Sequence, residues 1–235
     1  LDALVLDVKH GSGAFMKNAG DARRLAQAMV AVGRQLDVTT TALLTDMDQP
    51  LGRMIGNTVE VNESIDVLQG GGPTDVRELT LALSAEVMLS AGVSQSIDSA
   101  MQTLEDRLDS GFAFEKFAEM VAAQGGDLST DRRVAPAGDV RAPQSGIVQS
   151  IITQALGFVV IDLGGGRKIQ SDTLDHSVGI EMLVRVGDEV EQGQPMARIF
   201  ATTHAAEAAR MVIQEAIDIG EGPVEPRKLI EERIT

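Results

Sequence analysis

The chain has 235 residues, of which 43% are hydrophobic and 23% charged, and this composition is typical of a folded protein with a sizeable core. Its formal net charge is −15 and its Lys and Arg residues are scattered, which excludes the clustered basic surface that binds nucleic acid. The absence of Cys excludes disulfides, thiolate metal sites and Cys nucleophiles, and no apolar run reaches the roughly 20 residues of a membrane span. We therefore expect a cytoplasmic protein with neither nucleic acid nor a membrane as a partner.

The first elements predict a parallel sheet. The apolar run at residues 1–8 is typical of a buried parallel strand, and it leads into a glycine-rich turn at residues 9–16. Apolar residues at helical spacing predict a helix over 19–35, and β-branched residues predict a second strand over 39–44. This order indicates a βαβ unit, in which ligands bind at the C-terminal ends of the strands.

A helical region follows the second strand. Glycines mark the ends of most of its predicted helices, which span residues 57–68, 75–90, 96–108 and 112–123. The polar segment 125–143 contains two prolines and several charges, so we expect a linker or an irregular crossover there.

The last part of the chain changes character. Short β-like pieces are predicted at residues 146–153, 157–163, 178–185 and 196–201, and one helix at 205–219. The predicted fold class is therefore α/β: part of a parallel-sheet α/β domain with helices, residues 1–135, followed by a smaller α+β domain, residues 136–235. Because the chain opens directly on a core strand, we expect it to be a fragment of a longer protein.

Two strings in the smaller domain are similar to the halves of a biotinyl or lipoyl carrier domain, a barrel-sandwich hybrid. They are Ala-Pro-Gln-Ser-Gly-Ile-Val at 142–148 and Val-Gly-Asp-Glu-Val-Glu-Gln-Gly-Gln-Pro-Met at 186–196. A carrier needs a Lys at a hairpin tip, with characteristic flanking residues. Lys168 is in the right region, but neither of its neighbours fits. A structural barrel is the alternative to a carrier.

The glycine-rich turn is a weak signal when it is considered alone. Backbone N–H groups in such turns bind phosphate. However, Gly11 and Gly13 lack the third glycine and the downstream acid of a dinucleotide site, and no Gly-Lys-Ser/Thr of a Walker motif is present.

The longer strings are more specific. Asp-Val-Lys-His-Gly-Ser-Gly-Ala-Phe-Met-Lys at 7–17 resembles the signature of the thymidine and pyrimidine nucleoside phosphorylases, and further matches follow in order at 41–52, 56–63, 122–126 and 163–167 with 171–179. The resemblance implies reversible phosphorolysis: a pyrimidine nucleoside and the co-substrate phosphate give the free base and a pentose 1-phosphate. It leaves open whether the enzyme is specific for thymidine or accepts pyrimidine nucleosides broadly.

The resemblance also implies roles for loop residues. Phe15 matches the Phe that packs on the pyrimidine ring, with a core aromatic as the alternative. Ser12 and Gly13 match the flexible part of the loop, where backbone hydrogen bonds help to close the cleft; plain turn geometry is the alternative. Lys9 has three possible partners, namely phosphate, Asp7 and Asp46.

A monovalent cation, usually potassium, is a further implication of the resemblance. Leu51, Met54 and Glu63 lie at the spacing of two family carbonyl ligands and one carboxylate ligand, and oxygen donors suit a hard cation. The alternative is that Glu63 is a solvated helix residue. The histidines are too scattered to predict a metal cluster, and Asp172 and Asp175 lie in a turn-rich stretch, where we expect turn residues and not acid/base catalysts.

The family's phosphate loop and base-binding groups precede the matching region, so the catalytic residues are expected upstream of Leu1. We therefore expect this chain alone to be inactive, and the intact protein to be a homodimeric pentosyltransferase. The competing hypothesis is a non-enzymatic module that serves in assembly or as a biotinyl or lipoyl carrier.

Overall fold

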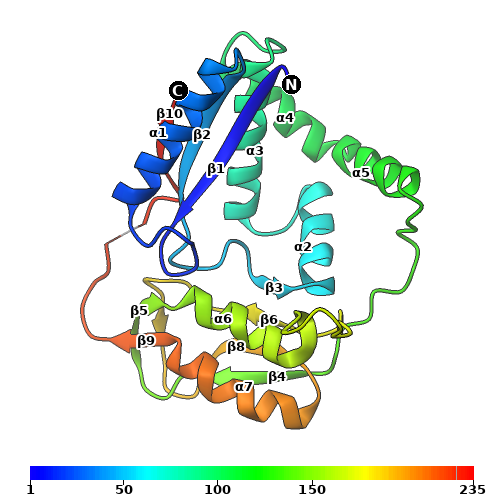
Figure 1. Cartoon of the computed structure of the whole chain (residues 1–235). Helices are drawn as coiled ribbons and strands as arrows, with labels where there is room; N and C mark the ends of the chain where they lie inside the picture. The colour runs from blue at the N-terminus through cyan, green and yellow to red at the C-terminus, as the bar shows by residue number, and fades with distance from the viewer. Residues whose placement is uncertain (226) are drawn as a thin grey trace. The chain divides into compact units, whose positions relative to one another are not determined.

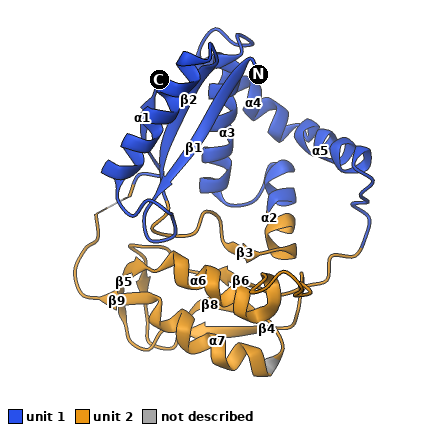
Figure 2. Ribbon diagram, viewed as in Figure 1, with its two compact units in different colours: residues 1–46, 64–130, 228–235 blue, residues 47–63, 131–227 orange. Residues whose placement is uncertain are grey.

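The structure, a computed structural model, describes residues 1–225 and 227–235, which form two compact units (Figures 1 and 2). The first unit contains Leu1–Asp46, Ser64–Thr130 and Lys228–Thr235, and the second contains Met47–Glu63 and Asp131–Arg227. The boundary between the units therefore falls within one helix, α2 (Thr58–Leu68).

The first unit is built on a three-stranded sheet. Its order is β1 (Ala3–His10), β2 (Thr39–Asp46) and β10 (Ile230–Ile234), with β1 parallel and β10 antiparallel to β2. The helix α1 (Ala19–Gln35) is the crossover of the predicted βαβ unit, and the side chain of Asn18 caps its start by accepting the N–H of Asp21. Small residues of α1 pack on apolar residues of the strands; this cluster includes Val8, Ala22, Ala26, Val30, Ala42 and Leu44.

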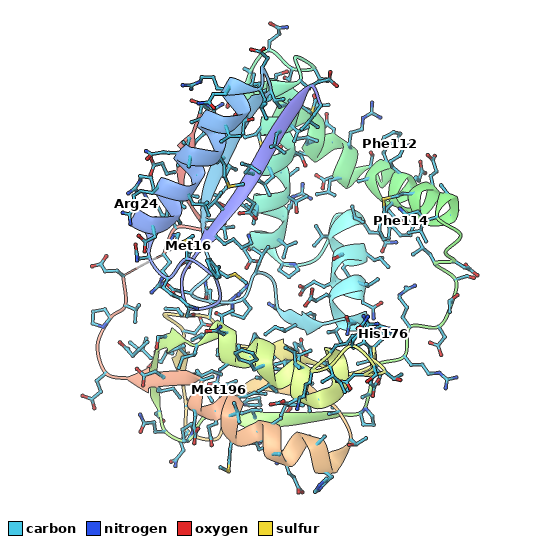
Figure 3. All side chains as sticks on the ribbon, in the orientation of Figure 1. Met16, Arg24, Phe112, Phe114, His176 and Met196 are labelled. Carbon is cyan, nitrogen blue, oxygen red and sulfur yellow. The ribbon has the colours of Figure 1, made fainter. Side chains whose placement is uncertain are left out.

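Two ion pairs of β10 show that helices cover both faces of this sheet. Glu232 pairs with Arg23 of α1 at 2.5 Å, and the next residue, Arg233, pairs with Glu86 of α3 (Thr74–Ser90) through two hydrogen bonds of 2.5 and 3.0 Å. Successive strand residues point to opposite faces, so α1 and α3 lie on opposite sides. Two further helices follow, α4 (Ile97–Asp109) and α5 (Phe112–Ala123). No residue of α5 is buried. Figure 3 labels two of its residues, Phe112 and Phe114.

The second unit contains two antiparallel sheets. One has the order β3 (Met54–Gly56), β6 (Gly179–Met182), β8 (Pro195–Phe200) and β4 (Ala137–Arg141); the other has the order β7 (Glu189–Val190), β5 (Gly146–Ile151) and β9 (Ile217–Gly220). Its helices are α6 (Thr153–Val160), which continues into a π-helical turn, η1 (Ile161–Gly165), and α7 (Thr203–Glu215). The largest fully buried core residues include Leu156, Ile180, Met182, Met196, Ile199 and Ile213; Met196 is labelled in Figure 3.

The two strings that resemble carrier halves lie together in this unit. The N–H of Val148 donates to the carbonyl of Asp188 at 2.9 Å, and the N–H of Ala142 donates to the carbonyl of Gln194 at 2.8 Å. The α/β fold class with a smaller, sheet-rich second part is confirmed. The sheets do not close into a barrel within the described residues.

Three local predictions were wrong. Residues 157–163, predicted as a strand, belong to α6 and η1, because a short apolar run does not distinguish a strand from a buried helix. The helix predicted over 205–219 ends at Glu215, and β9 follows it. The segment 125–143, predicted as a linker or crossover, contains β4, whose residues pair with β8 despite their turn-rich composition.

Candidate functional site

A closed glycine loop follows β1 in the first unit. The N–H of Gly11 donates to the carbonyl of Met16 at 3.0 Å, the N–H of Ala14 donates to the carbonyl of Gly11 at 3.1 Å, and His10 forms a β-bridge with Met16. The φ angle of Gly11 is 119°, which only glycine adopts readily. The loop therefore leaves the strand and returns to its base within six residues, with Met16, labelled in Figure 3, at the closing end.

The loop presents one aromatic side chain outward. Phe15 is 94% exposed, whereas the preceding Ala14 is buried at 7%. The alternative of a core aromatic is therefore wrong for this chain. Ser12 and Gly13 are in the same turn, where the Ser12 carbonyl accepts the ammonium of Lys17 at 3.1 Å. The structure thus brings together the three loop residues that the sequence singled out.

Polar side chains connect the C-terminal ends of β1 and β2. The ammonium of Lys9 pairs with the carboxylate of Asp7 and lies 3.5 Å from the hydroxyl of Thr45, which itself donates to Asp7 at 2.5 Å. Among the three partners considered for Lys9, the structure shows Asp7. Thr45 is fully buried, and its role was not foreseen because a Thr in a β-branched strand carries no signal of its own.

The second unit contains the residues predicted to bind a cation; Leu51 lies in the segment that leads into β3, and Met54 is the first residue of that strand. Interactions with the 182–186 region and with Arg227 anchor this segment. The N–H of Met182 donates to the carbonyl of Arg53 at 2.7 Å, the N–H of Val186 donates to the side chain of Gln49 at 3.1 Å, and Arg185 and Arg227 contact Pro50 and Asp48.

Glu63 of α2 reaches back to this segment. Its two carboxylate oxygens accept the N–H groups of Arg53 at 2.9 Å and Met54 at 3.4 Å. The N–H and C=O of one strand residue point to the same side of the strand, so the Met54 carbonyl also lies on the side of Glu63. The alternative of a purely solvated Glu63 is therefore wrong, because the carboxylate is hydrogen-bonded to the backbone of Arg53 and Met54, at the start of β3.

This donor set fits a hard monovalent cation. Carbonyl and carboxylate oxygens are the donors such an ion prefers, and each carboxylate oxygen has a second lone pair beyond the one that accepts an N–H. A site of this kind differs from a cluster of acidic or His side chains, and the part of the chain that the structure describes contains no group of three or more His, Asp or Glu residues that could hold a metal ion.

Two aspartates of the second unit form turns. Asp172 accepts the N–H groups of Ile169 and Lys168 at 3.0 and 2.9 Å, and Asp175 accepts the hydroxyl and N–H of Ser177 at 2.6 and 2.9 Å. These hydrogen bonds lower the pKa of each carboxyl, because they stabilise the ionised form. The carboxylates therefore hold their turns and are poor proton donors, as we expected of turn residues.

Lys168 is not placed as a carrier lysine would be. It follows the π-helical turn η1, outside any strand, and its ammonium pairs with Asp162 at 2.6 Å. A carrier attaches its prosthetic group to a lysine at a hairpin tip. The geometry therefore gives no support to the carrier hypothesis.

Comparison with known proteins covers most of the chain. Residues 1–114 match the glycosyl transferase family a/b domain, and residues 147–220 match the pyrimidine nucleoside phosphorylase C-terminal domain. The pyrimidine-nucleoside phosphorylases of Bacillus subtilis (strain 168) and Geobacillus stearothermophilus are 40% and 38% identical over 240 residues, which cover 100% of this chain and 55% of each relative. That of Staphylococcus aureus (strain USA300) is 38% identical over 96% of the chain and 53% of the relative. The chain thus spans about half the length of the curated relatives it matches.

Within the described residues, no helix is long and apolar enough to cross a membrane.

Proposed function

The chain belongs to the pyrimidine nucleoside phosphorylase family, and on this premise we propose that the complete protein catalyses the reversible phosphorolysis of pyrimidine nucleosides. A phosphate oxygen bonds to the anomeric carbon of the pentose while the bond from that carbon to the base nitrogen breaks. The electron pair of the broken bond stays on the base, and the products are the free base and a pentose 1-phosphate. The observation that carries the proposal is the match of residues 1–114 and 147–220 to two family domains, together with 40% identity to a pyrimidine-nucleoside phosphorylase over the whole chain.

In this proposal the glycine loop contacts the nucleoside. Phe15 packs its exposed ring on the pyrimidine, which replaces water on two apolar surfaces. Ser12 and Gly13 help to close the site through their backbone. The protein groups that bind phosphate and the polar atoms of the base are assigned to the part of the complete protein outside this chain. This assignment rests on the family resemblance.

The proposed potassium ion is held by the Leu51 and Met54 carbonyls and by Glu63. Its support is the hydrogen bonding of the Glu63 carboxylate to the N–H groups of Arg53 and Met54. When bound, the ion supplies positive charge that keeps the segment before β3 in place against α2. The complete protein is proposed to act as a homodimer in the cytoplasm, whose reducing conditions suit a chain without Cys.

The test uses the complete protein. Release of thymine from thymidine and of uracil from uridine is measured with and without phosphate, and with potassium or choline as the cation. We expect phosphate-dependent release that potassium stimulates, and the ratio of the two rates reports the specificity. If neither base is released in the presence of phosphate and potassium, the proposed function is wrong.

A further inference from the structure

His10 occupies the base of the glycine loop and is buried. It continues the row of Leu6 and Val8, two residues apart along β1, which packs on the α1 side of the sheet. The residue is only 6% exposed, and its backbone bridges to Met16, where the loop returns. A change in the position of His10 is therefore transmitted directly to both ends of the loop.

Glu231 reaches this histidine from β10. Strand alternation would place it with Arg233, on the α3 side of the sheet. However, the register shifts between Ile230 and Glu232, which pair with the consecutive residues Thr45 and Leu44, so Glu231 is an extra residue. Such bulges re-aim a side chain and are frequent beside active sites. Here the result is that the Glu231 carboxylate lies 3.2 Å from Nε2 of His10.

This pair differs from its neighbours on the same strand. Glu232 and Arg233 are paired with partners that are charged at neutral pH, whereas the cationic partner of Glu231 is a histidine, whose charge depends on protonation. Among the described residues, His10 Nε2 has no partner in hydrogen-bond geometry despite its proximity to Glu231. Protonation gives the ring a positive charge, which makes the 3.2 Å contact with the Glu231 carboxylate an ion pair.

Other charged groups border the pair on each packed element. They are Asp46, in register with His10 on β2; Glu232 on β10 with Arg23 on α1; and Asp7 with Lys9 on the opposite face of β1. Glu232 and Asp7 each pair with a cation of their own, so Glu231 is the carboxylate that lies within ion-pair distance of the His10 ring, at 3.2 Å.

We propose that His10 is a positioning residue for the proposed phosphorolysis: its imidazolium pairs with Glu231, and this clasp fixes the base of the glycine loop and thereby the place of Phe15. The inference rests on the proposed function for its kinetic consequence, but the clasp itself is a property of the fold. Loss of the clasp leaves the chemistry unchanged and weakens nucleoside binding, because His10 is buried and acts through the position of the loop.

The kinetic test compares three variants of the complete protein. His10→Gln and Glu231→Gln each remove one charge of the clasp, and we expect each to raise KM for the nucleoside about five- to tenfold with kcat within about twofold. Glu232→Gln, one residue along β10, is the matched control and should keep the wild-type KM. In the wild type the KM should rise as the imidazole loses its proton, and in His10→Gln it should be high at every pH. A wild-type KM in His10→Gln across the pH range overturns the proposal.

A structural measurement separates this proposal from the proposed function. The chain has three histidines, so the imidazole signals of His10 are assigned in NMR spectra by comparison with His10→Gln. Amide exchange of Gly11 and Ala14, which donate the loop's hydrogen bonds, should accelerate about five- to tenfold, relative to intrinsic rates, as the His10 signal reports deprotonation. If loop exchange does not follow the His10 titration, the clasp is refuted. If exchange follows it while no phosphorolysis is found, the clasp stands and the proposed function fails.

Discussion

Phe15 is the residue whose exposure most needs an explanation. A phenyl ring that is 94% exposed contributes almost nothing to the core, so its substitution tests binding with little effect on folding. We expect Phe15→Ala to lower kcat/KM for the nucleoside about tenfold, because an aromatic contact of about 1 kcal/mol or more is lost. The free energy of unfolding should change by less than about 0.5 kcal/mol.

The control for Phe15 is Phe112→Ala in the same unit. Phe112 is 43% exposed on α5, and its ring contacts the Arg107 guanidinium at 4.6 Å. Kinetic constants measured in parallel should stay within about twofold of wild type for Phe112→Ala. Equal kinetic losses in both variants would show that the effect of Phe15 is not specific.

Glu63 is tested by removing its charge. Glu63→Gln keeps one oxygen for the backbone N–H groups but removes the negative charge that balances a cation, so the potassium concentration for half-maximal activity should rise at least about tenfold. Glu60→Gln is the control, since the Glu60 carboxylate accepts the Gly56 N–H at 2.8 Å and partial burial raises the pKa of its carboxyl. An unchanged potassium response in Glu63→Gln would exclude Glu63 as a ligand.

At the scale of elements, α1 and β2 approach each other at one glycine. A Cβ built on Gly33 would lie 2.0 Å from the hydroxyl oxygen of Thr40, so the helix must move for any larger residue to fit. We expect Gly33→Ala to destabilise the protein by about 1–3 kcal/mol, as overpacking does. Urea unfolding followed by circular dichroism measures this change.

Gly157 provides the opposite case. It also lies in a helix, α6, but a Cβ there would meet no atom within 4 Å. Gly157→Ala should therefore stabilise the protein by up to about 1 kcal/mol through the helix propensity of Ala. If both substitutions had the same sign of effect, the close approach of α1 to β2 would not be the cause.

Helices whose ends are marked by capping or glycine residues were predictable from the sequence. The bounds of α1 and α5 match the predictions, because apolar spacing and flanking Asn18 or Gly111 mark them. Short strands were not predictable: β4, β7 and β10 are stabilised by partners distant in the sequence. In β10, three consecutive charged residues lie between two Ile residues, and its place in the sheet depends on β2.

For the candidate site, the sequence proposes residues, and the structure adds their contacts. The motif singled out Ser12, Gly13 and Phe15, and the spacing singled out Leu51, Met54 and Glu63. The bonds from Glu63 to the 53–54 backbone, and the bulge that turns Glu231 toward His10, depend on tertiary structure. A single sequence contains no signal for a pairing between residues 10 and 231.

At the scale of the whole molecule, hydrogen-bonded aspartates couple stability to pH. Hydrogen bonds lower the pKa of Asp127 in the first unit and of Asp172 and Asp175 in the second below the ordinary value of 3.8. A group with a lowered pKa in the folded state stabilises that state above its unfolded pKa and loses this contribution as the pH falls through the folded value. Stability should therefore decline as the pH is lowered below about 4.

The measurement is the urea midpoint between pH 7 and pH 2.5. The triple variant Asp127→Asn, Asp172→Asn and Asp175→Asn should show a weaker decline on acidification than the wild type, since its side chains do not titrate. Asp37→Asn, which changes a residue with positive φ outside these turns, is the control and should retain the wild-type slope. An unaltered slope in the triple variant would assign the acid sensitivity to other carboxylates.

The placement of β10 has a consequence for the order of events during translation. The sheet of the first unit needs Ile230–Ile234 beside β2, yet the ribosome makes these residues only after all of the second unit. The early strands must therefore wait, with one flank of β2 open, until residues 230–234 have been made, and this pairing joins residues more than 180 positions apart. The second unit is thus free to fold first, although it is encoded later.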